Sequence, residues 1–183
     1  MNTTLYINPL TPEITFLIFD WDQTIAKTLA KNLDTASTFP KLLSGIVDEY
    51  QIDTIWCVTG PGPFTLMRVV TLAINAISYT RTISVKSCHF FDLITSGNLA
   101  IIEANPREYL IRTGGEVVSI EKALLPAGSY EGIFSEIDST GDTKYIQYSE
   151  DRANIYQVFS AKTPETRISP LYFKPPHITC PQP

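Results

Sequence analysis

The chain has 183 residues, of which 44% are hydrophobic and 18% are charged, with 14 basic and 19 acidic side chains. This length suits one domain or two small lobes, and the apolar fraction excludes an intrinsically disordered chain. A formal net charge of −5 supplies no broad cationic field, which argues against direct binding of nucleic acid through phosphate neutralisation.

The cysteines and the apolar segments indicate where the protein resides. Cys57, Cys88 and Cys180 form neither a C-x-x-C motif nor a Cys/His cluster, so we expect free thiols and no metal site. The N-terminus lacks a basic start followed by an apolar stretch, and no window reaches the about 20 apolar residues of a membrane span. We therefore expect a soluble, cytoplasmic protein that does not associate with membranes.

The first 30 residues predict three consecutive strands. Residues 5–8 are a short apolar start, and residues 14–19 form a near-continuous apolar run, typical of a strand covered on both faces. A polar turn at 20–23 leads into a loosely alternating segment at 24–29. The last two strands are therefore expected to form a hairpin.

Apolar segments with helical spacing then alternate with apolar runs of strand length. The first expected helix has Ser37 as its N-cap, Pro40 in its first turn and apolar residues at helical spacing over 42–50. After it we expect a strand over 53–58, a helix over 64–78, a strand over 82–85 and a short helix over 88–96. Such alternation implies parallel pairing through right-handed crossovers, while the opening hairpin implies an antiparallel edge. This α/β order is that of a ribonuclease H-like lobe, the unit of the actin and sugar-kinase (ASKHA) superfamily.

The pattern is weaker in the second half of the chain, where a shortened second lobe is expected. It predicts a strand meander over 99–103, 109–112 and 116–120 with a Gly114-Gly115 turn, and short helices over 120–125 and 151–160. Residues 169–183 are rich in proline and predict an extended tail instead of a packed element. No internal repeat is evident. The expected divisions are an N-terminal lobe over 1–97, a smaller second lobe over 98–167 and a proline-rich tail over 168–183.

The segment Phe-Asp-Trp-Asp-Gln-Thr over 19–24 is the strongest candidate for a catalytic motif. Haloacid dehalogenase-like phosphatases use Asp-x-Asp-x-Thr after an apolar strand to present a nucleophile, an acid/base group and a Mg²⁺ site. Thr59 and Lys86 could serve as that superfamily's phosphate-holding groups. Because no later acidic pair completes the metal site, a solvated hairpin turn is favoured. A magnesium-dependent phosphatase that uses Asp20 and Asp22 is the alternative function.

A longer segment carries a family resemblance. Residues 55–70, Ile-Trp-Cys-Val-Thr-Gly-Pro-Gly-Pro-Phe-Thr-Leu-Met-Arg-Val-Val, resemble the strand, Gly-Pro-Gly-Ser-Phe-Thr-Gly-Leu-Arg turn and helix of the TsaB (YeaZ) family. Residues 5–20 and 39–43 resemble the family's first two strands and first helix. Residues 101–109 and 170–176 are similar to its Ile-Asp-Ala-Arg-x-x-Glu-Val-Tyr strand and its terminal Pro-x-Tyr-Leu-Arg motif.

The chain departs from the family pattern at informative positions. Pro63 replaces Ser and Leu66 replaces Gly in the signature, and Asn8 replaces the Asp that helps nucleotide-binding members of the superfamily to hold a metal-bound phosphate. Hydrolysis of ATP in the cleft is therefore not expected. The His-x-x-x-His motif that carries the metal in the catalytic paralogue TsaD is absent, and His89 and His177 are expected to be ordinary residues.

The resemblance implies a non-catalytic subunit that binds and activates TsaD and, with TsaE, supports threonylcarbamoyladenosine modification of transfer RNA. It implies a homodimer when alone, contact with tRNA only through the complex, no cofactor of its own, and ATP or ADP only at the interface with TsaD. Family members pair through their first two helices. The signature turn is Gly60, Pro61 and Gly62, and the expected interface residues are Leu42, Phe64, Thr65, Met67, Arg68 and Thr71, with no catalytic residue.

Overall fold

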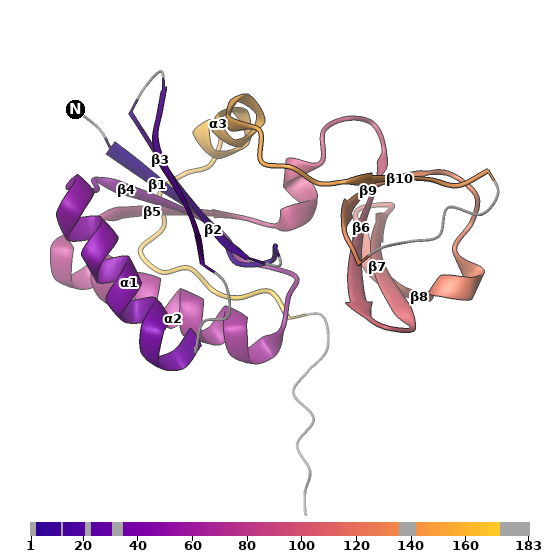
Figure 1. The fold of residues 1–183 in the computed structure, drawn as a ribbon, viewed down its shortest axis with the longest axis horizontal. Helices are drawn as coiled ribbons and strands as arrows, with labels where there is room; N and C mark the ends of the chain where they lie inside the picture. The colour runs from indigo at the N-terminus through magenta and orange to yellow at the C-terminus, as the bar shows by residue number, and fades with distance from the viewer. Residues whose placement is uncertain (1–2, 12, 21–22, 31–34, 136–141, 173–183) are drawn as a thin grey trace, which may run out of the picture.

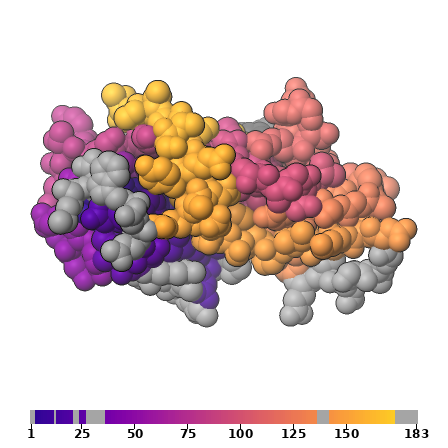
Figure 2. Space-filling view, turned by 90° about the horizontal axis from the view of Figure 1, so that it is seen from above, coloured from indigo at the N-terminus to yellow at the C-terminus, as the bar shows by residue number. Residues whose placement is uncertain are grey.

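The protein contains two five-stranded sheets that lie side by side (Figure 1). A computed structural model describes residues 3–11, 13–20, 23–30, 35–135 and 142–172. The space-filling view shows an elongated molecule, with the segment that follows residue 150 lying over its N-terminal half (Figure 2). No described helix is long and apolar enough to cross a membrane.

The first sheet confirms the expected antiparallel edge and parallel crossovers. Its strands are β1 (Thr3–Asn8), β2 (Ile14–Asp20), β3 (Gln23–Ala30), β4 (Thr54–Val58) and β5 (Ser84–Cys88), in the order β3-β2-β1-β4-β5. β2 is antiparallel to both β1 and β3, whereas β1, β4 and β5 are parallel. The carboxyl ends of the parallel strands therefore meet at one edge.

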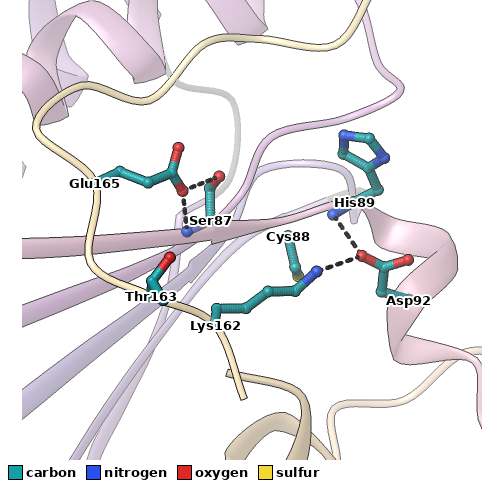
Figure 3. A pocket seen from close by; sticks show the side chains of 7 residues that line it. All are labelled: Ser87, Cys88, His89, Asp92, Lys162, Thr163 and Glu165. Carbon is teal, nitrogen blue, oxygen red and sulfur yellow. Dashed lines mark hydrogen bonds and ion pairs between the residues drawn. The ribbon is translucent and has the colours of Figure 1, made fainter. Parts of the chain in front are cut away.

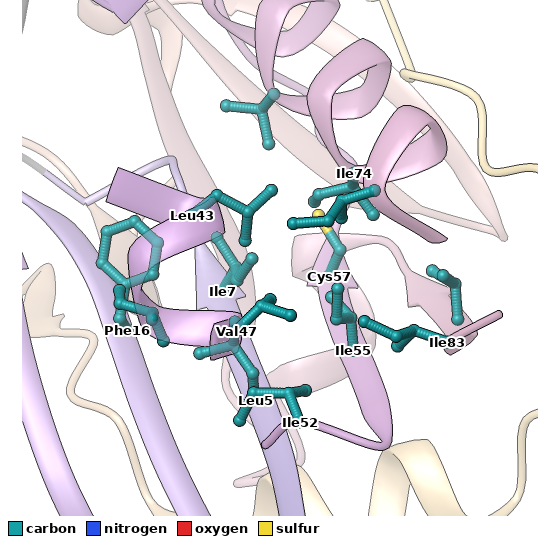
Figure 4. Packing of buried hydrophobic residues seen from close by; sticks show 14 of the residues in the cluster. Leu5, Ile7, Phe16, Leu43, Val47, Ile52, Ile55, Cys57, Ile74 and Ile83 are labelled. Atoms are coloured by element: carbon teal, nitrogen blue, oxygen red, sulfur yellow. The ribbon is translucent and has the colours of Figure 1, made fainter. Parts of the chain in front are cut away.

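Two helices cover one face of this sheet, α1 (Thr35–Tyr50) and α2 (Phe64–Arg81). Ser37 lies inside α1 and is not its N-cap, because the helix already begins at Thr35. The buried ring of Phe39, two residues after Ser37, stacks on Phe16 at 5.9 Å. The main core lies between the helices and the sheet (Figure 4). Its residues include Leu5, Ile7, Phe16, Leu43, Val47, Ile52, Ile55, Cys57, Ile74 and Ile83.

The second sheet contains the predicted meander and two strands that were not predicted. Its strands are β6 (Leu99–Asn105), β7 (Glu108–Thr113), β8 (Glu116–Glu121), β9 (Ser129–Ile133) and β10 (Lys144–Gln147), in the order β10-β9-β6-β7-β8. The expected turn is confirmed between β7 and β8, where Gly114 and Gly115 have φ values of 58° and 88°. Such angles favour glycine because it has no Cβ.

Both sheets have the same topology, which is an internal repeat that the sequence does not reveal. Each has three consecutive antiparallel strands followed by two parallel ones. The β8 to β9 crossover contains the three-residue 3₁₀ helix Lys122–Leu124, at the place where the first sheet has the 16-residue α1. The second lobe is thus shortened in its helices and not in its sheet, and the predicted fold class is confirmed.

Helix α3 (Arg152–Ser160) falls within the range expected for the second lobe, yet it packs on the first sheet (Figures 1 and 2). The Phe159 ring stacks on Trp56 at 5.1 Å and meets the edge of Tyr6 at 5.9 Å. Asp151 caps the helix, since its side chain accepts hydrogen bonds from the N–H groups of residues 153 and 154. The chain therefore returns to the first lobe before residue 160.

Glu103 ties β6 to the short crossover of the second sheet. Its carboxylate pairs with Lys122 and accepts hydrogen bonds from Ser135 N and Oγ, both at 2.6 Å. Burial alone would raise the pKa of Glu103, but the hydrogen bonds from Lys122 and Ser135 outweigh it and lower the pKa to about 2. The pKa of Glu103 in the folded protein is thus lower than its ordinary value of 4.5. Ionisation of Glu103 therefore stabilises the folded state, and this stabilisation is fully present above pH 4.5.

We expect this stabilisation to be lost as the pH falls from 4.5 towards 2. Urea unfolding at a series of pH values measures the difference in free energy of unfolding between the wild type and Glu103→Gln. This difference should become smaller as the pH is lowered through this range. A difference that stays constant with pH would contradict the assignment of this acid sensitivity to Glu103.

Candidate functional site

The signature turn, Gly60, Pro61 and Gly62, lies between β4 and α2, and hydrogen bonds to backbone oxygens fix it together with the preceding Thr59. Thr59 N and Oγ1 donate to Cys88 O at 3.0 and 3.2 Å, and Phe90 N donates to Gly60 O at 2.8 Å. Leu171 N, from near the C-terminus, donates to Thr59 O at 2.7 Å. The Gly60-Pro61 peptide bond is cis, and Gly60 has a φ of 128°. The turn is therefore a packed structural unit.

Met67 and Thr71 lie in the core and not at the predicted interface. A Cβ added at Gly62 would lie 2.3 Å from Leu10 Cδ2 and 3.0 Å from Met67 Sδ, so Met67 packs directly beneath the turn. Met67 is 0% exposed and Thr71 2%, and the Thr71 hydroxyl donates to Met67 O at 2.8 Å. The assignment of both side chains to a contact surface is wrong, because this stripe of α2 faces the sheet.

The other predicted contact residues remain at or near the surface. Thr65 and Arg68 are exposed, and Leu42 and Phe64 are half-buried. The Arg68 guanidinium lies 5.9 Å from the centre of the Phe64 ring, whose other neighbour is Tyr172 at 4.5 Å. These contacts hold the Phe64 ring at the start of α2.

Sequence reasoning missed the apolar residues on the outside of α2. Leu72 is 53% exposed and Tyr79 is 89% exposed. Together with Thr65, Arg68 and Ala76, they form what we call the outer stripe, whose spacing of three and four residues follows the helix period. The sequence contains this signal: counting in helical steps of three and four residues from Thr65 leads to Leu72 and Tyr79.

α1 lies against α2 and extends the same surface (Figure 1). Arg81 near the end of α2 pairs with Asp48 of α1 through Nη1 and Oδ1 at 2.6 Å. Gly45 is exposed, and an added Cβ there would meet nothing within 4 Å. The two helices thus present one continuous face to solvent.

Residues 165–172, which we call the C-terminal strap, are attached to the first lobe, although the residues from 168 onwards were predicted as part of an extended tail. Glu165 N donates to Val85 O at 2.8 Å, and the Asn75 amide exchanges two hydrogen bonds with the backbone of Ile168, at 2.9 and 3.0 Å. Ile168 itself is 1% exposed. These partners satisfy backbone groups of Glu165 and Ile168, in a segment that is neither a helix nor a named strand. His177 and Cys180 lie outside the described residues.

A cavity of about 280 Å³ lies between β5 and the segment before the strap (Figure 3). Lys162 Nζ lies 3.1 Å from Asp92 Oδ2, and Arg112 Nη1 lies 2.7 Å from the other carboxylate oxygen. Ser87 N and Oγ donate to Glu165 Oε1 at 3.0 and 2.6 Å. Lys162 and both carboxylates of this cavity therefore have partners, and the contact between Ser87 and Glu165 attaches the start of the strap to β5.

Neither His89 nor Cys88 adds reactive chemistry to this cavity. The His89 ring points away from the Asp92 carboxylate, which accepts a hydrogen bond from the His89 backbone N–H at 3.4 Å (Figure 3). Burial and the nearby Asp92 carboxylate raise the pKa of the Cys88 thiol, and burial likewise raises that of Cys57. Both thiols are therefore protonated at neutral pH and inert as nucleophiles.

The structure does not bring Asp20 and Thr59 of the phosphatase alternative together. Because β2 is antiparallel to β1, Asp20 pairs with Thr3 and lies at the end of the sheet opposite to Thr59. Asp22 lies outside the described residues. Within those residues, no group of His, Cys, Asp and Glu side chains could hold a metal ion.

The end of β1, where Asn8 stands in place of the superfamily's Asp, is occupied by a carboxylate from another part of the chain. Glu150 accepts hydrogen bonds from Asn8 Nδ2 at 2.9 Å, Tyr6 OH at 2.8 Å and Tyr148 OH at 2.9 Å. Burial and the Glu150 charge raise the pKa of both tyrosines, which keeps them protonated as donors. We call these four residues the Glu150 cluster.

Comparison with solved structures identifies the architecture. A Pseudomonas aeruginosa protein described as uncharacterized with similarity to peptidase YeaZ superposes with a TM-score of 0.60 at 12% identity, covering 95% of this chain and 100% of that one. YeaZ from the same organism gives a TM-score of 0.56 at 13% identity, covering 94% and 100%. The chain has the fold of YeaZ. The resemblance predicted from the signature turn is thus confirmed at the level of structure. No protein-family model and no curated protein matches the sequence.

Proposed function

We propose that this chain is a non-catalytic, cytoplasmic subunit that binds and activates a TsaD homologue and acts with a TsaE homologue in threonylcarbamoyladenosine modification of tRNA. The observation that carries the proposal is the outer stripe of α2, which exposes Leu72 and Tyr79 on a chain with the YeaZ fold. Exposed apolar side chains grouped on one face are typical of a protein interface. Thr65 and Arg68 belong to this stripe, and Leu42 and Phe64 are included in the proposed surface beside it.

Two further features support an accessory role. The polar groups at the end of β1 are engaged within the Glu150 cluster, where nucleotide-binding relatives keep a carboxylate for a metal-bound phosphate. The net charge of −5 supports contact with tRNA only through the other subunits. In this proposal ATP or ADP binds only at the interface with TsaD.

The same helical face serves a second copy of the chain when TsaD is absent. A self-complementary surface explains how apolar side chains such as Leu72 are kept from water in the free protein. Homodimer and complex then exclude each other, because both use the outer stripe.

Leu72→Glu is expected to lower the affinity for the TsaD homologue by at least about tenfold, because a charge is placed in the apolar centre of the surface. Leu124→Glu is the matched control, since Leu124 is 67% exposed but lies on the crossover of the second sheet. Affinities are measured by titration of the purified proteins. Equal affinities of the two variants would place the interface elsewhere.

Met67→Glu is not a useful interface variant. It would bury an unpaired carboxylate under the signature turn, where Met67 is 0% exposed, and would therefore unfold the protein whatever the role of α2. Circular dichroism of Leu72→Glu must match the wild type for the binding result to count.

A further inference from the structure

The face of the first sheet that carries α3 also carries a row of hydroxyl side chains beside a hollow. The strand register places Thr4 of β1 beside Thr54 of β4, and Thr54 beside Ser84 of β5. Residues in register on neighbouring strands point to the same face, so the three hydroxyls lie in line. They form the floor of a hollow of about 160 Å³.

Aromatic rings form the walls of this hollow. Phe19 is in register with Thr4 on the other side of β1, and its ring meets that of Trp56 at 5.2 Å. Tyr156 projects from α3, lies 5.8 Å from Trp56 and is 45% exposed. A flat ring that enters the hollow would thus meet Phe19 and Tyr156, and aromatic pairs favour stacked or edge contacts.

The Lys86 ammonium supplies a positively charged hydrogen-bond donor beside the same space. Lys86 is in register with Trp56, its Nζ lies 6.0 Å from the Trp56 ring, and it donates to Phe159 O at 3.0 Å. The ammonium has two further donors. Trp56 is 6% exposed, and its indole N–H has no acceptor among the described residues.

A second hollow of about 230 Å³ shares Phe19 and Tyr156 with the first and is bordered by Arg152. Lys86 and Arg152 therefore flank the aromatic walls, and within the described part of the chain no carboxylate lines either hollow. An anionic ligand is favoured over a cationic one at this place.

We propose that this hollow is a binding site for a small aromatic carboxylate. The ring lies between Phe19 and Tyr156 above the hydroxyl floor, and the carboxylate pairs with the Lys86 ammonium. The volume fits one ring with a short substituent. The site lies on the face of the sheet opposite to α1 and α2 and therefore does not overlap the proposed partner surface.

Benzoate is the probe, titrated into the full-length wild-type protein in the millimolar range where a one-ring ligand is expected to bind. The readout is the NMR signal of the Trp56 indole N–H. Benzamide, which has the ring without the charge, and cyclohexanecarboxylate, which has the charge without the flat ring, should each bind about fivefold more weakly. Equal binding of the three probes, or no response of the Trp56 signal to benzoate, overturns the proposal.

Lys86→Met should reduce benzoate binding to the level of benzamide and leave benzamide unchanged. Lys162→Met is the matched control, because Lys162 lines the other cavity beside β5 and pairs with Asp92. Benzoate binding that survives Lys86→Met, or that falls equally in Lys162→Met, contradicts the assignment. The probe series on the wild type decides the question even where a variant fails to fold.

Discussion

Gly60→Ala is expected to lower the free energy of unfolding by about 3 kcal/mol or more, since it combines backbone strain with a steric clash. Gly60 has a φ of 128°, a region that residues with a Cβ rarely adopt. A Cβ at this position would lie 2.5 Å from the backbone oxygen of Leu171. That oxygen belongs to the C-terminal strap and cannot move without disturbing the Leu171 to Thr59 hydrogen bond.

The matched control is Gly97→Ala. Gly97 also has a positive φ, 82°, but an added Cβ there would meet nothing within 4 Å. Gly97→Ala should therefore lower the free energy of unfolding only through conformational strain, by about 1 kcal/mol. Urea unfolding measures both variants, and hydrogen exchange at Leu171 N–H reports whether the strap is released. An equal loss in free energy of unfolding for Gly60→Ala and Gly97→Ala would show that the strap does not pack tightly against the signature turn.

The fold of the first lobe could be predicted because its signals are local. The apolar run at 14–19, the helical spacing after the signature turn and the turn itself each specify a neighbouring element. The second sheet was predicted only in its meander, which a Gly-Gly turn marks. β9 and β10 escaped because short parallel strands such as Lys144–Gln147 are defined by pairing with distant partners, which no local pattern shows.

The buried side of α2 could not be derived from its own residues. Apolar residues lie on two sides of this helix. Their helical spacing therefore predicts that the segment is a helix but does not predict which side faces the sheet. Met67 is buried because Leu10 and Gly62 close over it, and Leu10 lies far away in the sequence. Only the tertiary structure therefore separates Met67 from the exposed Leu72.

The Glu150 cluster could not be predicted either, because it joins residues near the two ends of the chain that only the tertiary structure brings together. Loss of its carboxylate is the second change for which we expect a large effect on stability. Glu150→Ala should lower the free energy of unfolding by about 3 kcal/mol, because it leaves buried donors without an acceptor. Tyr6 and Asn8 are both 0% exposed, so water cannot easily replace the carboxylate. Since Glu150 directly precedes the cap of α3, its loss should also loosen that helix from the first sheet.

Glu150→Gln should cost less than Glu150→Ala, since the amide retains one acceptor oxygen and a tyrosine hydroxyl can turn to accept from its NH₂ group. Glu131→Ala is the control for a carboxylate lost elsewhere, because Glu131 accepts from Asn98 Nδ2 at 3.2 Å on the second sheet. Combining Tyr6→Phe with Glu150→Gln in a double-mutant cycle isolates their coupling. A Glu150→Ala cost no larger than that of Glu131→Ala, with no coupling to Tyr6, would mean that the cluster does not hold the end of β1 in place.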